Sequence, residues 1–244
     1  MRQERAVTGS REGNTCRKIG CLRDGGQMKA LVLGDEVAEI LHSGKVRSHC
    51  QGADLILSTG DLPADYLEYV VTMLNVPMLY VLGNHDRPWE LQDGEMIDGP
   101  RGGENVDEQV ICLDQPSGDP LCVAGLEGSP WYNGEGHQYT KREMRRKASR
   151  LARRLHIGQL RGRRLGVLLT HAAPKGIHDA KGRAHRGFDS ILHIIRRSSP
   201  AMQSTVTCIL PTDTIQSPEL SEERRFSTSI DTHSWRSIHE QRRL

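Results

Sequence analysis

The strongest constraint on this chain is a pattern of three apolar segments that each end directly in polar residues. The segments are LVLGDE, which ends in Asp35 and Glu36, LILSTGD, which ends in Asp61, and LYVLGNHD, which ends in Asn84, His85 and Asp86. A fourth segment, LGVLLTHAAP, leads into His171 in the same way. Short apolar runs followed by Gly and polar residues are typical of buried β-strands. We therefore expect these polar side chains to meet at one rim of a sheet.

Apolar strands alternate with amphipathic helices between Lys29 and Pro200, and the chain is 36% hydrophobic, enough for one core. We predict strands at Ala30–Leu33, Asp54–Ser58, Met78–Val81, Val110–Leu113, Leu121–Ala124 and Leu165–Thr170. We predict helices at Ala64–Leu74, Lys141–Leu155 and Phe188–Arg196. Alternation of this kind predicts a single α/β domain over residues 28–200, with a largely parallel sheet covered by helices.

The two flanking segments lack apolar periodicity. Residues 1–27 are rich in Arg, Gly, Ser and Thr, and we expect a disordered extension that ends at Met28, a candidate natural start. Residues 201–244 are rich in Ser, Thr and Arg, and we expect a poorly ordered tail.

Charge and cysteine content narrow the function classes. Thirty-three Lys and Arg residues against 31 Asp and Glu residues give a net charge of +2, which argues against nucleic acid or an anionic membrane as the main partner. No apolar run approaches the roughly 20 residues that span a bilayer, so we expect a cytoplasmic protein. The six cysteines are scattered along the chain, and we predict reduced thiols. The sequence makes no prediction of oligomeric state.

The polar residues after the four strands form a mixed set of metal donors. Asp35 and Asp61 offer carboxylates, Asn84 an amide oxygen and His171 an imidazole. This combination suits Mn, Fe or Zn better than Ca alone.

The order of these motifs resembles the calcineurin-like metallophosphoesterase superfamily. Its signature runs Asp-x-His, Gly-Asp, Gly-Asn-His-Asp or Glu, a lone His, then Gly-His-x-His. Gly60-Asp61 and Gly83-Asn84-His85-Asp86 match in the correct order, and AGLEGSPWYNGEGHQYT and THAAPKGIHDAKGRAHRGF also look like members of the superfamily. The resemblance covers residues 29–200.

The resemblance implies an αββα sandwich of two mixed sheets flanked by helices, and hydrolysis of phosphate esters on small molecules or nucleotides at two divalent metal ions. It makes Asp61 the bridging ligand, assigns Asp35 to the first metal and assigns Asn84 and His171 to the second. His85 is implied as the donor or general acid beside the leaving group, with Asp86 orienting its ring. Two cations about 4 Å apart clamp the phosphate and lower the pKa of a bridging water.

Two positions depart from the family pattern. Val37 stands where the family has the His of Asp-x-His, and this loss predicts a weaker first metal site. Glu36 is a poor substitute because consecutive side chains diverge on a strand. No Gly-His-x-His follows His171, so by this resemblance we expect the domain to lack its last ligands and to be C-terminally incomplete.

The amino-acid sequence after Pro200 suggests a reason for the second departure. One permitted codon set for residues 203–209, QSTVTCI, encodes Ile-His-Gly-His-Leu-His when read from its third base. We hypothesise that a frameshift or a misjoined gene model replaced the authentic C-terminus. Sequencing the gene across Pro200 tests this, because codons that cannot encode the motif contradict it.

Two alternatives to the enzyme remain open, a scaffold and a nucleic-acid binder. The missing donors favour a non-catalytic interaction scaffold built on the same fold. The basic segment KREMRRKASRLARRLHIGQLRGRR has apolar residues at helical spacing, so we favour a packed helix with a solvated basic face over a nucleic-acid site. His137, His178 and His185 are expected to be solvated loop residues.

Overall fold

The computed structural model describes residues 17–20, 28–90, 94, 96–115, 118–176 and 186–198. Two four-stranded sheets form its centre. The first consists of β2 (Ala30–Leu33), β3 (Leu55–Ser58), β4 (Met78–Tyr80) and β7 (Gly103–Asn105), in the order β2-β3-β4-β7. All its neighbouring strands are parallel, so their carboxyl ends lie along one edge.

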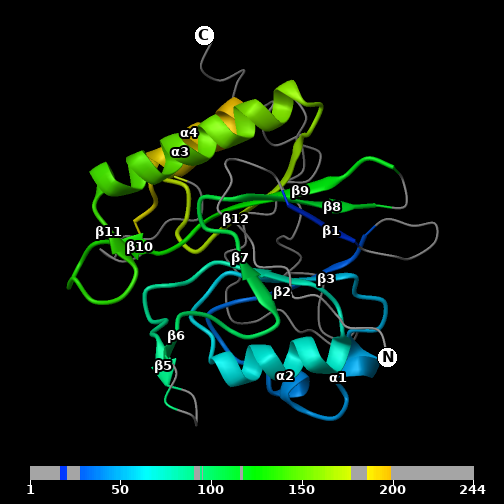
Figure 1. Cartoon of the computed structure of the whole chain (residues 1–244). Helices are drawn as coiled ribbons and strands as arrows, with labels where there is room; N and C mark the ends of the chain where they lie inside the picture. Colours follow the sequence, from blue (N-terminus) through cyan, green and yellow to red (C-terminus); the bar gives the residue numbers. More distant parts are fainter. Residues whose placement is uncertain are drawn as a thin grey trace, which may run out of the picture.

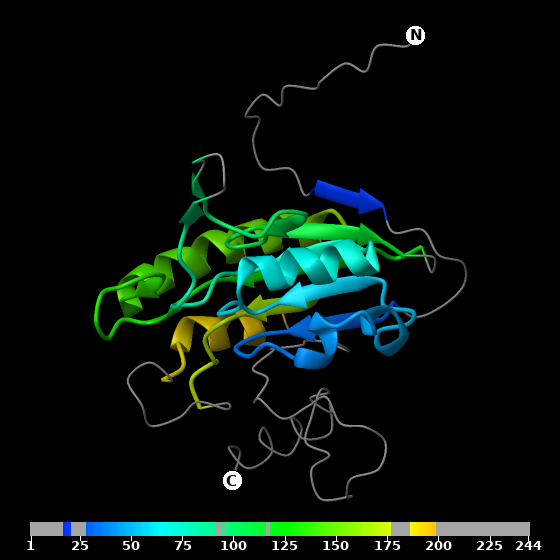
Figure 2. The same ribbon diagram turned by 90° about the horizontal axis from the view of Figure 1, so that it is seen from below.

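The second sheet is mixed. It consists of β1 (Arg17–Gly20), β8 (Val110–Asp114), β9 (Leu121–Leu126) and β12 (Leu165–Thr170), in the order β1-β8-β9-β12. β8 and β9 are antiparallel, whereas β1 runs parallel to β8 and β12 parallel to β9. In the view from below, β1 lies at the edge of this sheet (Figure 2).

Helices cover the outer face of each sheet, which gives four layers (Figure 1). The 3₁₀ helix η1 (Glu39–His42), α1 (Val46–His49) and α2 (Ala64–Leu74) pack on the first sheet. α3 (Lys141–Leu160) and α4 (Asp189–Ser198) pack on the second. Two small ribbons complete the described elements, β5 (Trp89–Glu90) with β6 (Met96–Ile97), and β10 (Ser129–Pro130) with β11 (Gln138–Tyr139). No helix among the described residues has the length and apolar character needed to cross a membrane.

Side-chain alternation along the strands builds the three cores between these layers. Leu55 and Leu57 of β3 point between the sheets, where they meet Val123 of β9 and Leu169 of β12. Ile56 lies on the opposite face of β3 and packs with the α2 side chains. β3 is therefore buried on both faces, which explains why it reads as a continuous apolar run.

Local signals set the ends of the longer helices. Thr140 caps α3, because its hydroxyl accepts from the Glu143 N–H while the Glu143 carboxylate accepts from the Thr140 N–H. α2 ends at Asn75, which takes the left-handed conformation common at helix ends. α3 buries Met144, Ala148 and the neighbouring apolar positions, so the packed basic helix is confirmed.

The α/β class and all the predicted strands and helices are confirmed, with boundaries that move by a few residues. One correction concerns the sheets: the first is wholly parallel, whereas two mixed sheets were expected. Another concerns residues 17–20, which form β1 within a segment expected to lack regular structure. The tail from residue 201 lies outside the described residues.

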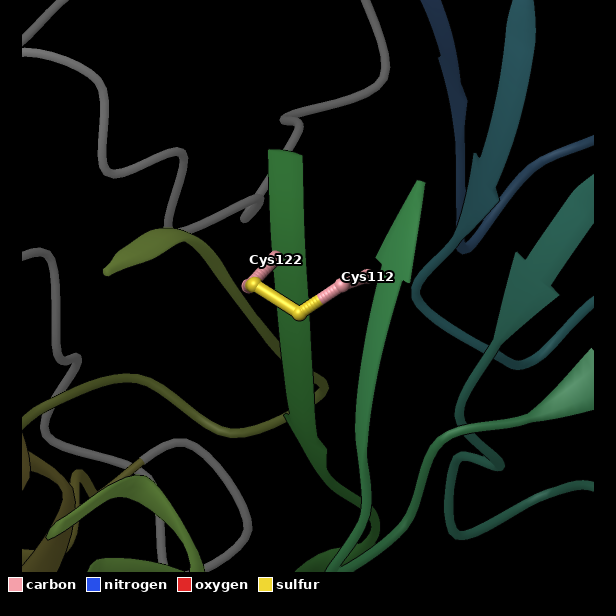
Figure 3. Close-up of a disulfide and its surroundings, with 2 residues drawn as sticks. All are labelled: Cys112 and Cys122. Atoms are coloured by element: carbon pink, nitrogen blue, oxygen red, sulfur yellow. A yellow bond between two sulfur atoms is a disulfide. The ribbon is translucent and has the colours of Figure 1, made fainter. Parts of the chain in front are cut away.

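The prediction of reduced thiols is wrong for one pair of cysteines. Cys112 and Cys122 form a disulfide between β8 and β9 (Figure 3). The antiparallel register places them directly opposite each other, with Cα atoms 4.0 Å apart. Spacing along the chain gives no hint of this pairing, because it depends on the strand register. Cys50 is a free cysteine, and Cys16, Cys21 and Cys208 lie outside the described residues.

Candidate metal centre

Four predicted donor residues lie at the carboxyl ends of strands. Asp35 follows β2, Asp61 follows β3 and Asn84 follows β4, all in the first sheet. His171 directly follows β12, which belongs to the second sheet. The expectation of a single sheet rim is therefore wrong for His171, and the site lies across the two packed sheets.

The four side chains meet in what we call the donor cluster, Asp35, Asp61, Asn84 and His171. Asp35, Asp61 and His171 each place one ligand atom within 4.8 Å of the others. The Nε2 atom of His171 lies 3.0 Å from Oδ1 of Asn84 and 3.5 Å from Oδ2 of Asp61. Residues far apart in sequence thus bring two carboxylates, an amide oxygen and an imidazole to one point.

Hydrogen bonds outside the donor cluster orient two of its members. Nδ1 of His171 lies 2.9 Å from the Thr59 carbonyl oxygen, and a proton donated to that oxygen from Nδ1 leaves the lone pair on Nε2 for a metal ion. The Asn84 amide nitrogen donates to the Tyr132 hydroxyl at 3.1 Å, so its Oδ1 faces His171. Lone pairs on Nε2 and Oδ1 then converge with the Asp61 carboxylate. This donor set fits a divalent cation, and the partners of His171 and Asn84 serve as outer-shell supports.

The backbone at the two carboxylates adopts an uncommon conformation. Asp35 has φ of 59° and Asp61 has φ of 58°, both in the left-handed region. Few residues other than glycine adopt this region, although Asp does so more readily than most. Such outliers often mark functional sites, where the surrounding structure maintains them.

Glycines before Asp61 and Asn84 allow the strand ends to approach closely. A Cβ on Gly60 would lie 2.2 Å from the Gly83 nitrogen. A Cβ on Gly83 would lie 2.1 Å from Oδ1 of Asp61 and 2.7 Å from Cε1 of His171. Any larger residue at Gly83 must therefore displace two members of the donor cluster.

We expect Gly83→Ala to lower metal affinity by about tenfold or more, because loss of correct ligand support typically costs 10- to 100-fold. Titration with Zn²⁺ against a competing chelator measures this effect. Gly44→Ala is the matched control, since a Cβ at Gly44 has no heavy atom within 4 Å. Unchanged affinity in Gly83→Ala would show that the donor cluster does not bind the metal.

Asp86 and His85 differ from their predicted arrangement. The Asp86 carboxylate accepts from the backbone N–H groups of Asp61, at 2.9 Å, and Gly83, at 2.7 Å. Burial raises the pKa of Asp86, and these two N–H groups partly offset the shift. Asp86 thus joins the two ligand loops, and no hydrogen bond to the His85 ring occurs among the described residues. His85 is exposed, and its backbone N–H donates to Oδ1 of Asp61 at 2.8 Å.

The positions that depart from the family pattern lie outside the donor cluster. Glu36 and Val37 are exposed, with Val37 at 38%. Glu36 is not among the carboxylates that meet at the cluster within the described part of the chain. The substitute role considered for Glu36 is therefore not supported.

Sequence reasoning missed several residues that support this region. No pattern singles out Tyr132, because its contact with Asn84 joins residues 48 positions apart. His137 was expected to be solvated, but its Nδ1 lies 3.5 Å from the Glu127 carboxylate and its side chain is 28% exposed. His178 and His185 lie outside the described residues.

No family model and no curated protein matches this chain. One solved structure aligns over 70% of this chain and 80% of its own, with 15% sequence identity and a TM-score of 0.46. A likeness at this level does not identify a function.

Proposed function

We propose that this protein hydrolyses phosphate esters at a dinuclear metal site, with the fold of a calcineurin-like metallophosphoesterase. The observation that carries the proposal is the donor cluster, in which four ligand-type side chains from four strand ends converge. Phosphorylated small molecules or nucleotides are the proposed substrates. The motif order of Gly60-Asp61 and Gly83-Asn84-His85-Asp86 supports the same family.

In this proposal, Asp61 would hold both ions, Asp35 would hold the first, and Asn84 and His171 would hold the second. The ions would be Mn, Fe or Zn, and they would supply a nucleophilic hydroxide and charge stabilisation. His85 would donate a hydrogen bond or proton to the leaving oxygen from its exposed position. Thr59, Tyr132 and the His85 N–H hold the ligands in place before the metal binds.

The two proposed metal sites have unequal numbers of donors. The second site receives Asp61, Asn84 and His171, whereas the first receives only Asp35 and Asp61 from the described residues. We therefore expect one tighter and one weaker equivalent of Mn²⁺ in a calorimetric titration. His171→Ala should weaken the tighter equivalent and Asp35→Asn the weaker one. Two equal equivalents, or the opposite assignment, would contradict this.

The function is tested by release of nitrophenol from bis-p-nitrophenyl phosphate and from p-nitrophenyl phosphate. Activity is expected with added Mn²⁺ and is expected to disappear with a chelator. The comparison of the two substrates distinguishes diesters from monoesters. Metal binding without hydrolysis of either substrate would argue against the enzyme.

A non-catalytic scaffold is the second candidate. It is favoured by Val37 and Glu36, which are exposed and leave the first metal site poor in donors. This alternative predicts metal binding that stabilises the fold while no ester is hydrolysed. A metal-dependent rise in melting temperature together with absent turnover would support it.

A further inference from the structure

A second cluster of charged residues lies beside the donor cluster. Glu127 directly follows β9, and β9 pairs in parallel with β12, which leads into His171. Leu126 and Thr170 are partners in this register, so Glu127 and His171 leave neighbouring strands at the same edge. Glu127 is nevertheless buried, with an exposed fraction of 8%.

Glu127 belongs to a network around Lys147 of α3, which we call the lysine network. The Lys147 ammonium contacts Asp107, and it lies 3.2 Å from Glu127 and 3.4 Å from Glu108. The Tyr139 hydroxyl donates to Glu127, and Lys147 lies 4.4 Å from the centroid of the Tyr139 ring. Nδ1 of His137 lies 3.5 Å from the same Glu127 oxygen.

The charges of the lysine network favour a protonated His137. Asp107, Glu108 and Glu127 surround a single ammonium, and Arg150, which pairs with Glu108, has a side chain that is 47% exposed. The hydrogen bond to Glu127 raises the pKa of His137, burial opposes it, and the charges of Glu127 and Asp86 raise it further. Lys147 acts in the opposite direction. His137 therefore retains its proton at higher pH than an ordinary histidine.

The segment that carries His137 lies directly on the Asn84 loop. The Gly128 N–H donates to the Leu82 carbonyl at 2.8 Å, and Tyr132 contacts the Asn84 side chain. A Cβ on Gly136 would lie 2.4 Å from the Asn84 carbonyl oxygen. These contacts place the backbone next to His137 against a member of the donor cluster.

We propose that His137, held by Glu127, binds a phosphate oxygen of the substrate next to the donor cluster. The inference rests on the proposed function, because it assumes a phosphate bound at that cluster. Glu127 acts as a positioning residue, since it contacts His137 and not the substrate. An imidazolium at this place adds a charge-assisted hydrogen bond to the anion, and such bonds are among the stronger ones in proteins.

The experiment measures the affinity of the Zn²⁺-loaded protein for inorganic phosphate by calorimetry in wild type, His137→Gln and His156→Gln. His156 is an exposed histidine on α3 and provides the matched control. We expect His137→Gln to weaken phosphate binding by about tenfold at pH 6.5, as for loss of a hydrogen bond to a charged group. His156→Gln should bind as wild type does.

The pH dependence separates this role from a structural one. The difference in affinity between wild type and His137→Gln should be largest below the pKa of His137 and should vanish as the pH rises through it. In Glu127→Gln, NMR titration of the His137 ring should give a lower pKa, and the difference should vanish at lower pH. If His137 had only a structural role, Glu127→Gln would not change the pH at which the difference in phosphate affinity vanishes.

The outcomes distinguish the inference from the proposed function. If His137→Gln binds phosphate more weakly but the wild type hydrolyses no ester, the role of His137 is supported and the proposed enzymatic function is contradicted. Ester hydrolysis with equal phosphate affinity in wild type and His137→Gln overturns the role of His137 alone. Failure of wild type to bind phosphate overturns it as well.

Discussion

Asp61→Asn is expected to lower phosphate-ester hydrolysis by about 10³-fold or more, because metal-ion catalysis contributes several kcal/mol of transition-state stabilisation. The change removes the one carboxylate proposed to contact both ions. Asparagine keeps the shape of the side chain, and its Oδ1 can still accept from the His85 N–H, as Asp61 does at 2.8 Å. The fold should therefore persist while the metal charge is no longer balanced.

Nitrophenol release at saturating Mn²⁺ measures this loss, and circular dichroism checks the fold. Asp119→Asn is the matched control, because Asp119 is exposed and precedes β9, at the end of the strand opposite to Glu127. Its rate should equal that of wild type. Equal rates for Asp61→Asn and wild type would show that Asp61 takes no part in the reaction. That result would also contradict the dinuclear site.

Lys147→Met is expected to have the largest effect on stability, lowering the free energy of unfolding by about 3–5 kcal/mol. Methionine fills a similar volume but removes the ammonium from Asp107 and Glu127. Glu108 also loses this contact but keeps its ion pair with Arg150. Uncompensated carboxylates in a buried position carry a large desolvation penalty. The loss should therefore exceed that of a surface ion pair, which is worth at most about 1 kcal/mol.

Urea denaturation followed by circular dichroism measures the effect. Lys141→Met provides the control, since Lys141 is exposed on the same helix, and we expect a change within about 0.5 kcal/mol. A loss in Lys147→Met no larger than this would show that the lysine network does not stabilise the fold.

The acid side of the stability curve gives an independent check on the same network. Burial raises the pKa of Glu127 in the folded state. The hydrogen bonds from His137 and Tyr139 and the charge of Lys147 lower this pKa by more, so the net shift is downward. Its contribution to stability is therefore present above the ordinary carboxyl pKa and is lost as the pH falls through the lowered one. Lys147→Met should reduce this loss, because it removes part of the shift.

Much of the fold follows from local pattern. Ala30–Leu33, Leu165–Thr170 and Ala64–Leu74 have the same bounds in the prediction and in the structure. Apolar runs and helical spacing depend only on neighbouring residues, so they can be read from one chain. The short elements β7 and β10 carry too few apolar residues to give such a signal.

The sequence around Lys147 contains a local signal that this side chain is buried. It lies three residues after Met144 and four before Leu151, on the face of α3 that is buried. A charged residue within an apolar stripe predicts a buried partner. Which carboxylates provide it, however, depends on segments that lie up to 40 positions before Lys147.

The sequence by itself determined that this chain forms an α/β domain and that Asp35, Asp61, Asn84 and His171 each follow a strand. Only the tertiary structure decided that His171 comes from the second sheet and that the disulfide joins Cys112 to Cys122. It also decided that His137 lies against Glu127. The physical reason is that strand periodicity is a local property, whereas sheet membership and register are set by burial of apolar faces between distant segments.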